Sequence, residues 1–209
     1  MGEAGAPGPT GEVRVQVVTG DPLVDRATSV YRQMLAQAGV PGAEEAQPPQ
    51  SRPPGRTAFH VAIDASGTAL GVVHTTLGAL DELLMARWMD PDERLGGPIC
   101  ECPSIAVRPE AAGAGITELL FRSVYCFARR QGARSLATVL DPFSLTLFRD
   151  EYGILFRTLG PVTTELGFET VPVGEGLHEL EDGLRRLRPE FLAFLTEPFS
   201  AAERARFGL

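Results

Sequence analysis

The chain has 209 residues, of which 44% are hydrophobic and 22% are charged, as in ordinary folded globular proteins. This length supports one well-filled core, or a domain with an appendage, but hardly two independent domains, so we expect one domain. The net charge of −8 argues against nucleic acid as the main partner, because phosphate binding needs a basic surface. All 19 basic residues are arginine, which excludes Schiff-base chemistry on lysine and a phosphate-loop lysine.

The sequence carries no sign of a membrane span or a secretion signal. No apolar run approaches the roughly 18 residues that cross a bilayer. Residues 1–12 are rich in glycine, proline and alanine and contain no basic or apolar stretch. We therefore expect a flexible N-terminal tail over residues 1–12 and a cytoplasmic location.

The first half of the chain alternates strand and helix patterns. Five prolines and two glycines exclude regular structure over residues 40–57, and Ser66-Gly67 indicates a tight hairpin turn. The predicted elements are a strand over 13–18, a helix over 21–38, strands over 59–65 and 69–77, and a short helix over 80–89.

The second half predicts a strand, a long helix and then shorter elements. These are a strand over 99–107, a helix over 116–130, a strand over 135–140, a helix over 143–152, strands over 154–157 and 165–171, and a helical tail from residue 176. The apolar face of the tail is Leu177, Leu180, Leu184, Leu187 and Leu192. Together these elements predict a mixed sheet with helices on both faces.

Residues 99–132 form the most informative segment, because an apolar strand leads through a small-residue turn into the long helix. The turn from Ala111 to Gly115 has no bulky side chain, so several backbone N–H groups can point the same way at the positive end of a helix. This arrangement indicates a cradle for a diphosphate group.

The same segment resembles the core of the GNAT superfamily of acyltransferases, whose turn follows a Val-x-Pro-x-x-Arg-Gly-x-Gly-Ile-Gly pattern. The matching residues are Val107, Pro109, Gly113, Gly115 and Ile116. Ala112 stands where the family usually has Arg or Gln, and Thr117 stands where it has Gly or Ala.

The resemblance implies an α/β fold with a mixed, mostly antiparallel central sheet and helices on both faces. It implies an acyltransferase domain over residues 13–173 and a C-terminal helical extension over 174–209 that packs on the same domain. The donor's pantetheine arm would lie along Ile105, Ala106 and Val107. Its diphosphate would lie on the turn formed by Ala112, Gly113, Ala114, Gly115 and Ile116.

Glu101 is a carboxylate in an otherwise apolar strand, where an unpaired charge would be costly. It could act as a general base, or it could be paired with an arginine or with backbone amides. Residues 101–107 also resemble the Glu-x-x-Arg-x-x-Val stretch of acyl-homoserine-lactone synthases and N-acyl amino acid synthases, with Ser104 in place of the Arg.

A general acid is harder to assign. Asp141, Ser144, Leu147 and Phe148 occupy the spacing of a family pattern, Asn-x-x-Ala-x-x-Leu-Tyr, whose Tyr often reprotonates the leaving thiolate. By this resemblance Ser144 and Phe148 would lie beside the donor. Phe148 has no ionisable proton, so solvent or Tyr152, one helical turn later, could take that role, although Tyr152 could equally be a packing residue.

The cysteines and histidines offer two further alternatives. Cys100 or Cys102 could be a covalent nucleophile, but neither has a histidine at recognisable spacing. Three cysteines and three scattered histidines do not make a ligand set, so we expect no metal, and we expect His74 to be a structural histidine.

The expected function is transfer of an acyl group from an acyl thioester to the amine of a small molecule, by direct attack in a ternary complex. The donor would be acyl-CoA or the phosphopantetheine of an acyl carrier protein, and a homodimer is left open. An acidic carrier could dock on a basic patch built from Arg108, Arg122, Arg129, Arg130 and Arg134. The alternative is a catalytically weak GNAT-like domain that binds an acyl thioester or a partner protein.

Overall fold

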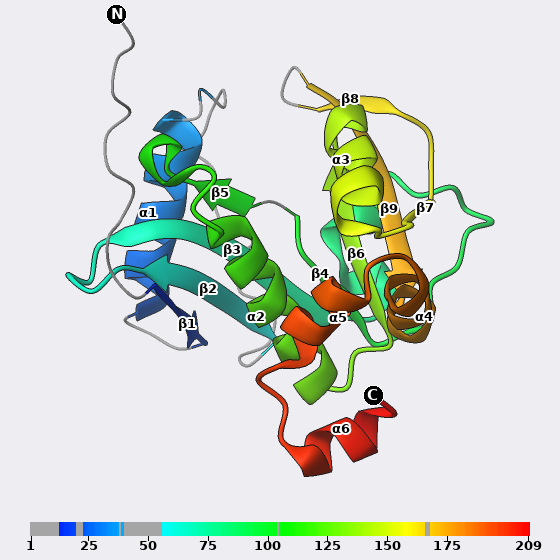
Figure 1. Ribbon diagram of the computed structural model, residues 1–209. Helices are drawn as coiled ribbons and strands as arrows, with labels where there is room; N and C mark the ends of the chain where they lie inside the picture. The colour runs from blue at the N-terminus through cyan, green and yellow to red at the C-terminus, as the bar shows by residue number, and fades with distance from the viewer. Residues whose placement is uncertain (1–12, 20–22, 38, 40–55, 104, 166–167) are drawn as a thin grey trace, which may run out of the picture. The chain divides into compact units, whose positions relative to one another are not determined.

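The computed structural model describes residues 13–19, 23–37, 39, 56–103, 105–165 and 168–209 (Figure 1). The chain divides into two compact units that alternate along the sequence. The first unit spans Met1–His74 and Ile105–Phe121, and the second spans Thr75–Ser104 and Arg122–Leu209. Strand β3 (Ala69–Gly78) and helix α2 (Ile116–Arg130) each contribute residues to both units.

The first unit is a small antiparallel sheet covered by a helix. Its further elements are β1 (Arg14–Val18), α1 (Leu23–Gln37), β2 (Thr57–Ile63), β5 (Ile105–Val107) and a 3-10 turn, η3 (Pro109–Ala111). Strand β1 pairs antiparallel with β2, and β5 pairs antiparallel with the first part of β3. Residues on one face of α1, including Tyr31 and Met34, form a core with Phe59, Val61 and Val72.

Gly71 of β3 sets how closely α2 approaches this sheet. A Cβ atom at residue 71 would lie 2.8 Å from Cγ2 of Ile116 and 3.1 Å from Cδ1 of Leu120. Both side chains are fully buried, so they have no open space into which to retreat. The absence of a side chain at residue 71 therefore allows the first turn of α2 to rest directly on β3.

The second unit contains the larger part of the sheet. Its elements are the end of β3, two 3-10 turns, η1 (Leu80–Glu82) and η2 (Leu84–Arg87), β4 (Ile99–Glu101), β6 (Ser135–Leu140), α3 (Pro142–Tyr152), β7 (Arg157–Thr158), β8 (Thr163–Glu165), β9 (Phe168–Gly176), α4 (Leu177–Leu187), α5 (Pro189–Thr196) and α6 (Ala201–Phe207). Strand β4 pairs antiparallel with β3 and parallel with β6, and β9 pairs antiparallel with β6, β7 and β8. The predicted mixed, mostly antiparallel sheet is confirmed.

The C-terminal helices pack on the second half of α2. Arg122 pairs with Glu197 at 3.3 Å, and Arg130 pairs with Glu203 at 2.8 Å. Buried Arg129 lies 3.1 Å from Oε1 of Glu181 on α4. The tail is thus fastened to α2 by ion pairs, and it belongs to the same compact unit as that half of the helix.

Several sequence predictions need correction. The strand expected over 99–107 is two strands, β4 and β5, and the helix expected over 80–89 is two 3-10 turns. Of the strand expected over 154–157 only residue 157 is extended, within β7. The tail is three helices, so Leu192 lies on α5, and Leu187 is 47% exposed rather than part of an apolar face.

Of the other predictions, two element bounds were confirmed, one boundary is displaced, and two segments lie outside the described residues. The helix over 116–130 and the strand over 135–140 have the predicted bounds. The boundary expected between residues 173 and 174 falls inside β9. Residues 1–12 and 40–55 lie outside the described residues. Within the described part of the chain, none of the helices has the length and apolar character needed to cross a membrane.

Two histidines lie in the interior of the first unit. His60 on β2 and His74 on β3 are both almost fully buried, and the His74 ring lies 5.2 Å from the ring of Phe59. Burial lowers the pKa of His74 to about 4, and burial together with His74 lowers the pKa of His60 to about 3. Both histidines are therefore neutral in the folded protein at neutral pH.

We expect the folded state to lose stability as the pH falls through 6.5. Below this pH, His60 and His74 each take up a proton in the unfolded chain but not in the folded one. This difference lowers the free energy of unfolding by about 1.4 kcal/mol per pH unit for each histidine. Urea unfolding at pH 7.0, 6.0 and 5.5 measures this slope. The variant His178→Asn, at an exposed position, should keep it. A free energy of unfolding that stays constant from pH 6.5 to 5.5 would contradict the buried neutral state.

Gly71→Ala should lower the free energy of unfolding by about 1–3 kcal/mol, the usual cost of an overpacked core. Gly183→Ala is the matched control, because a Cβ at this position inside α4 meets no atom within 4 Å. In a helix interior that exchange should stabilise by about 0.5–1 kcal/mol. Chemical denaturation of both variants checks the pair. Equal effects would show that close contact at residue 71 does not limit the approach of α2.

Candidate active site

The turn between β5 and α2, in the first unit, is anchored at its start by Arg108. The Arg108 backbone N–H donates to the carbonyl oxygen of Leu70 at 2.9 Å, and its Nε donates to that of Ala69 at 2.6 Å. Gly113 and Gly115 have φ values of +77° and +75°, which favour glycine. A Cβ at either position would meet no atom within 4 Å, so this turn faces open space.

The amide groups of this turn provide hydrogen-bond donors without acceptors. In the described part of the chain, no acceptor receives the N–H of Gly113, Gly115, Ile116 or Thr117. The last two begin α2, a 15-residue helix whose positive end lies here. N–H groups at such an end attract phosphate groups. Gly113 is exposed and Gly115 and Thr117 are half-buried, whereas Ile116 is only 1% exposed.

The three residues of strand β5 that are predicted to contact the donor differ in burial. Ala106 is buried in the core beneath α1, while Ile105 and Val107 on the other face are half-buried. The side chain of Ala106 is therefore taken up by the core, and only its backbone is available to a pantetheine arm. This detail refines the sequence-based expectation, which treated the three residues alike.

Glu101 lies at the end of β4 in the second unit, opposite Thr76 of β3, and is 1% exposed. Its Oε1 accepts the backbone N–H of Met85 at 2.7 Å, and its Oε2 accepts that of Leu84 at 3.1 Å. Of the structural alternatives, the backbone-amide pairing is the one found. These two bonds fix the orientation of the carboxylate.

The hydroxyl of Ser144 is engaged at the start of α3. It donates to Oδ2 of Asp141 at 2.5 Å, while the Ser144 backbone N–H donates to Oδ1 at 2.9 Å. Partial burial would raise the pKa of Asp141, but the hydrogen bonds from Ser144 outweigh it and the pKa is lowered. Asp141 is thus a helix N-cap, and Ser144 completes the cap.

Phe148 and Tyr152 belong to a chain of aromatic rings. The Phe148 ring lies 5.8 Å from Tyr152 and 5.4 Å from Phe156, and the Tyr152 ring lies 5.2 Å from Phe191. These distances are typical of packed aromatic pairs. The geometry matches the packing alternative for Tyr152 and leaves its proposed role as an acid without direct support.

The cysteines are poor nucleophiles. Burial raises the pKa of Cys102 to about 12, with Glu101 adding to the effect, and it raises the pKa of Cys100 still more strongly. Burial also raises the pKa of Cys126 to about 11. Their thiolate forms are scarce at neutral pH, which argues against a covalent acyl-enzyme. Among the described residues, no group of three His, Cys, Asp or Glu side chains could hold a metal ion.

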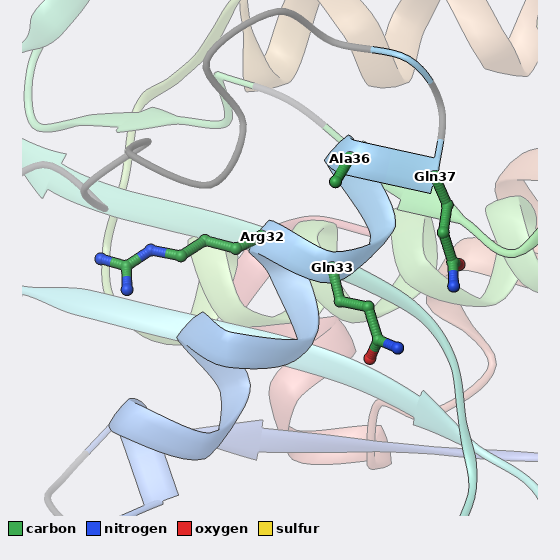
Figure 2. Close-up of a pocket in the computed structure, with 4 residues that line it drawn as sticks. All are labelled: Arg32, Gln33, Ala36 and Gln37. Atoms are coloured by element: carbon green, nitrogen blue, oxygen red, sulfur yellow. The ribbon is translucent and has the colours of Figure 1, made fainter.

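Sequence reasoning missed a surface pocket of about 520 Å³ on α1. It is lined by Arg32, Gln33, Ala36 and Gln37, and Figure 2 shows the two glutamine side chains projecting from one side of the helix while Arg32 extends away from them. No motif marked these residues. The i, i+4 spacing of Gln33 and Gln37 was the only available signal.

Comparison with known proteins gives the fold. No protein-family model matches the chain, and no curated protein matches it. The structure resembles BjaI, a CoA-dependent acyl-homoserine lactone synthase solved with SAM and isopentyl-CoA, with a TM-score of 0.66 and 13% identity over 94% of this chain and 99% of that one.

Two further solved structures share the fold. FeeM, an N-acyl amino acid synthase from uncultured soil microbes, matches with a TM-score of 0.57 and 14% identity over 83% of this chain and 96% of that one. NAA60 of Arabidopsis thaliana in complex with acetyl-CoA matches with a TM-score of 0.52 and 12% identity over 80% and 99%. The chain therefore shares the fold of these three structures, with its strongest likeness among them to the acyl-homoserine lactone synthase.

Proposed function

We propose that this chain is an N-acyltransferase that moves an acyl group from a thioester donor to the amine of a small molecule. The observation that carries the proposal is the row of acceptor-free N–H groups at Gly113, Gly115, Ile116 and Thr117. In a fold shared with proteins that bind CoA esters, these donors lie on the turn where the sequence pattern predicts the donor's diphosphate. The reaction is direct attack of the amine on the thioester within a ternary complex.

Glu101 is the proposed general base, acting directly or through a water molecule. Its two backbone hydrogen bonds fix the carboxylate in place, and a carboxylate can take up the proton of the attacking amine. Solvent or Tyr152 returns a proton to the leaving thiolate. Burial raises the pKa of the Cys100 and Cys102 thiols, which supports this pathway over one with a covalent acyl-enzyme.

The arginines of α2 bear on the choice of donor. Arg122, Arg129 and Arg130 are matched by Glu197, Glu181 and Glu203, so most of the predicted carrier-protein patch is already neutralised. This arrangement favours acyl-CoA over an acyl carrier protein as the donor. Comparing rates with the same acyl group on both carriers, at low and moderate salt, tests the preference.

A second candidate is a GNAT-like domain that binds a thioester without efficient turnover. It is favoured by Phe148, which has no ionisable proton, and by Ser144, whose hydroxyl is held by Asp141. Release of free thiol in the presence of a panel of amines distinguishes the two candidates.

Coenzyme A or its acyl derivatives should protect the amides of Gly113, Gly115, Ile116 and Thr117 from hydrogen exchange, because the diphosphate accepts their N–H groups. Gly115→Asp should weaken binding by placing a negative charge in the cradle and a side chain at positive φ. Gly132→Asp is the matched control, with a φ of +77° and open space but at the far end of α2. Unprotected amides at saturating thioester would refute the cradle.

Glu101→Gln should slow turnover by about 10²-fold while donor binding persists, as expected for loss of a general base. It should also cost about 1–3 kcal/mol of stability, because the new NH₂ group opposes one of the backbone N–H donors. Turnover across pH, below the melting temperature, separates the two effects. Glu82→Gln is the control, since Glu82 accepts the backbone N–H of Ala79 at 2.8 Å on the neighbouring 3-10 turn. Unchanged turnover in Glu101→Gln would leave Glu101 with a structural role.

A further inference from the structure

A polar cavity of about 660 Å³ lies in the second unit, where several elements meet at their ends. The beginning of β6, the end of β9 and the first turn of α4 line it, together with the loop that leads into β4. Its volume lies within the range of small-molecule sites. None of its lining residues belongs to the cradle or to the pair of amides that hold Glu101.

Hydrogen bonds fix the walls of this cavity. The hydroxyl of Ser135 donates to the carbonyl oxygen of Gly96 at 2.6 Å, and the N–H of Leu177 donates to that of Arg134 at 2.8 Å. Nη2 of Arg157 donates to the carbonyl oxygen of Arg94 at 3.0 Å. These hydrogen bonds tie the loop before β4 to β6 and to β7, and the start of α4 to the residue before β6.

Two guanidinium groups of the lining have unused donors. Arg129 is 7% exposed; its Nη2 donates to the carbonyl oxygen of Phe207 and its Nε lies 3.1 Å from Glu181. No hydrogen bond joins its Nη1 to any described residue. The side chain of Arg134 is exposed and has no hydrogen bond or ion pair within the described part of the chain. Arg134 can therefore attract an anionic group, and Nη1 of Arg129, whose charge Glu181 balances, adds a hydrogen-bond donor.

Two carboxylates, those of Glu175 and Glu179, add negative charge to the lining. Oε1 of Glu175 accepts the N–H of Gly176 at 2.9 Å, which leaves Oε2 available. The carboxylate of Glu179 lies over Gly176, so close that a Cβ there would be 1.9 Å from its Oε2. The absence of a side chain at residue 176 thus leaves room for the carboxylate of Glu179, which lines the cavity.

This mixture of charges selects among ligand classes. A simple anion would be attracted by the arginines and repelled by both glutamates. A simple cation would be attracted by the glutamates and repelled by the arginines. A small molecule with one charge of each sign satisfies both groups, because each of its ends then forms charge-assisted hydrogen bonds. The lining is therefore matched to a zwitterion.

The cavity is separate from Glu101. The register of β4 and β6 places Ile99 opposite Ser135 at the cavity, and Glu101 opposite Ala137, two residues further along. Ile99 and Ala137 are both buried in the core of this unit. A molecule in the cavity would thus be divided from Glu101 by packed side chains.

We propose that this cavity binds a zwitterionic small molecule of the α-amino acid class, with its carboxylate on Arg134 and Nη1 of Arg129 and its ammonium on Glu175 and Glu179. The proposal does not depend on acyl transfer. It assigns the chain a second ligand site in addition to the candidate active site.

Titration of the ¹⁵N-labelled protein with L-alanine tests this proposal. The amides of Ser135 and Gly176 should shift in a saturable manner. Propionate and ethylammonium, each retaining one charged end of alanine, should bind at least about 10-fold more weakly, and so should inorganic phosphate. Equal binding of propionate or phosphate would indicate an anion site, and equal binding of ethylammonium a cation site. Either result, or no shift with L-alanine, would overturn the proposal.

Charge-removing variants give an independent readout of the same site. Arg134→Gln and Glu179→Gln should each weaken alanine binding at least about 10-fold. Arg186→Gln and Glu190→Gln remove the same charges from exposed positions outside the cavity and should leave binding unchanged. Matching thermal unfolding curves ensure that all four variants are folded. Equal losses in the test and control pairs would show that only overall charge matters, which would contradict a defined site.

Discussion

The N-terminal end of α2 reaches the surface of β3 because residue 71 has no side chain. Ile116 and Leu120 occupy the space that a Cβ atom would need, and both are completely buried. The position of this first helical turn decides where the acceptor-free amides of the preceding residues point. Arg108 holds the other end of the turn against Ala69 and Leu70. The geometry of the cradle is thus set by the same strand at both ends.

A second constraint is the partnership between α2 and the C-terminal helices. Each arginine in its second half meets a carboxylate and an aromatic ring from the tail: Arg122 meets Glu197 and Phe194, Arg129 meets Glu181 and Phe207, and Arg130 meets Glu203 and Phe199. These residues looked like a docking surface in the sequence because their partners are more than 50 positions away. The positive charges of these three arginines form ion pairs with the C-terminal helices and loops, so they are not available to attract an acidic protein.

Sequence-based predictions were accurate where the signal is local, and they failed where the interacting residues are far apart in the sequence. Helix α2 and strand β6 were predicted with their bounds, because periodicity and glycine turns are local signals. The tail was mistaken for one helical face, although Pro189 at the first turn of α5 marks the break. The partners of Glu101 come from residues 16 and 17 positions earlier, where no pattern announces them. The charged cavity depends on tertiary contacts in the same way.

The distribution of ionisable groups narrows the chemistry of the proposed reaction. Burial raises the pKa of the cysteines beside Glu101 and keeps them as thiols, and Tyr152 packs against the rings of Phe148 and Phe191. Glu101 instead combines burial with a position fixed by two backbone hydrogen bonds. Its amide partners lie on η2, so the orientation of the carboxylate is coupled to that 3-10 turn. A change in η2 would therefore reach the proposed base through two hydrogen bonds, without any direct contact with substrate.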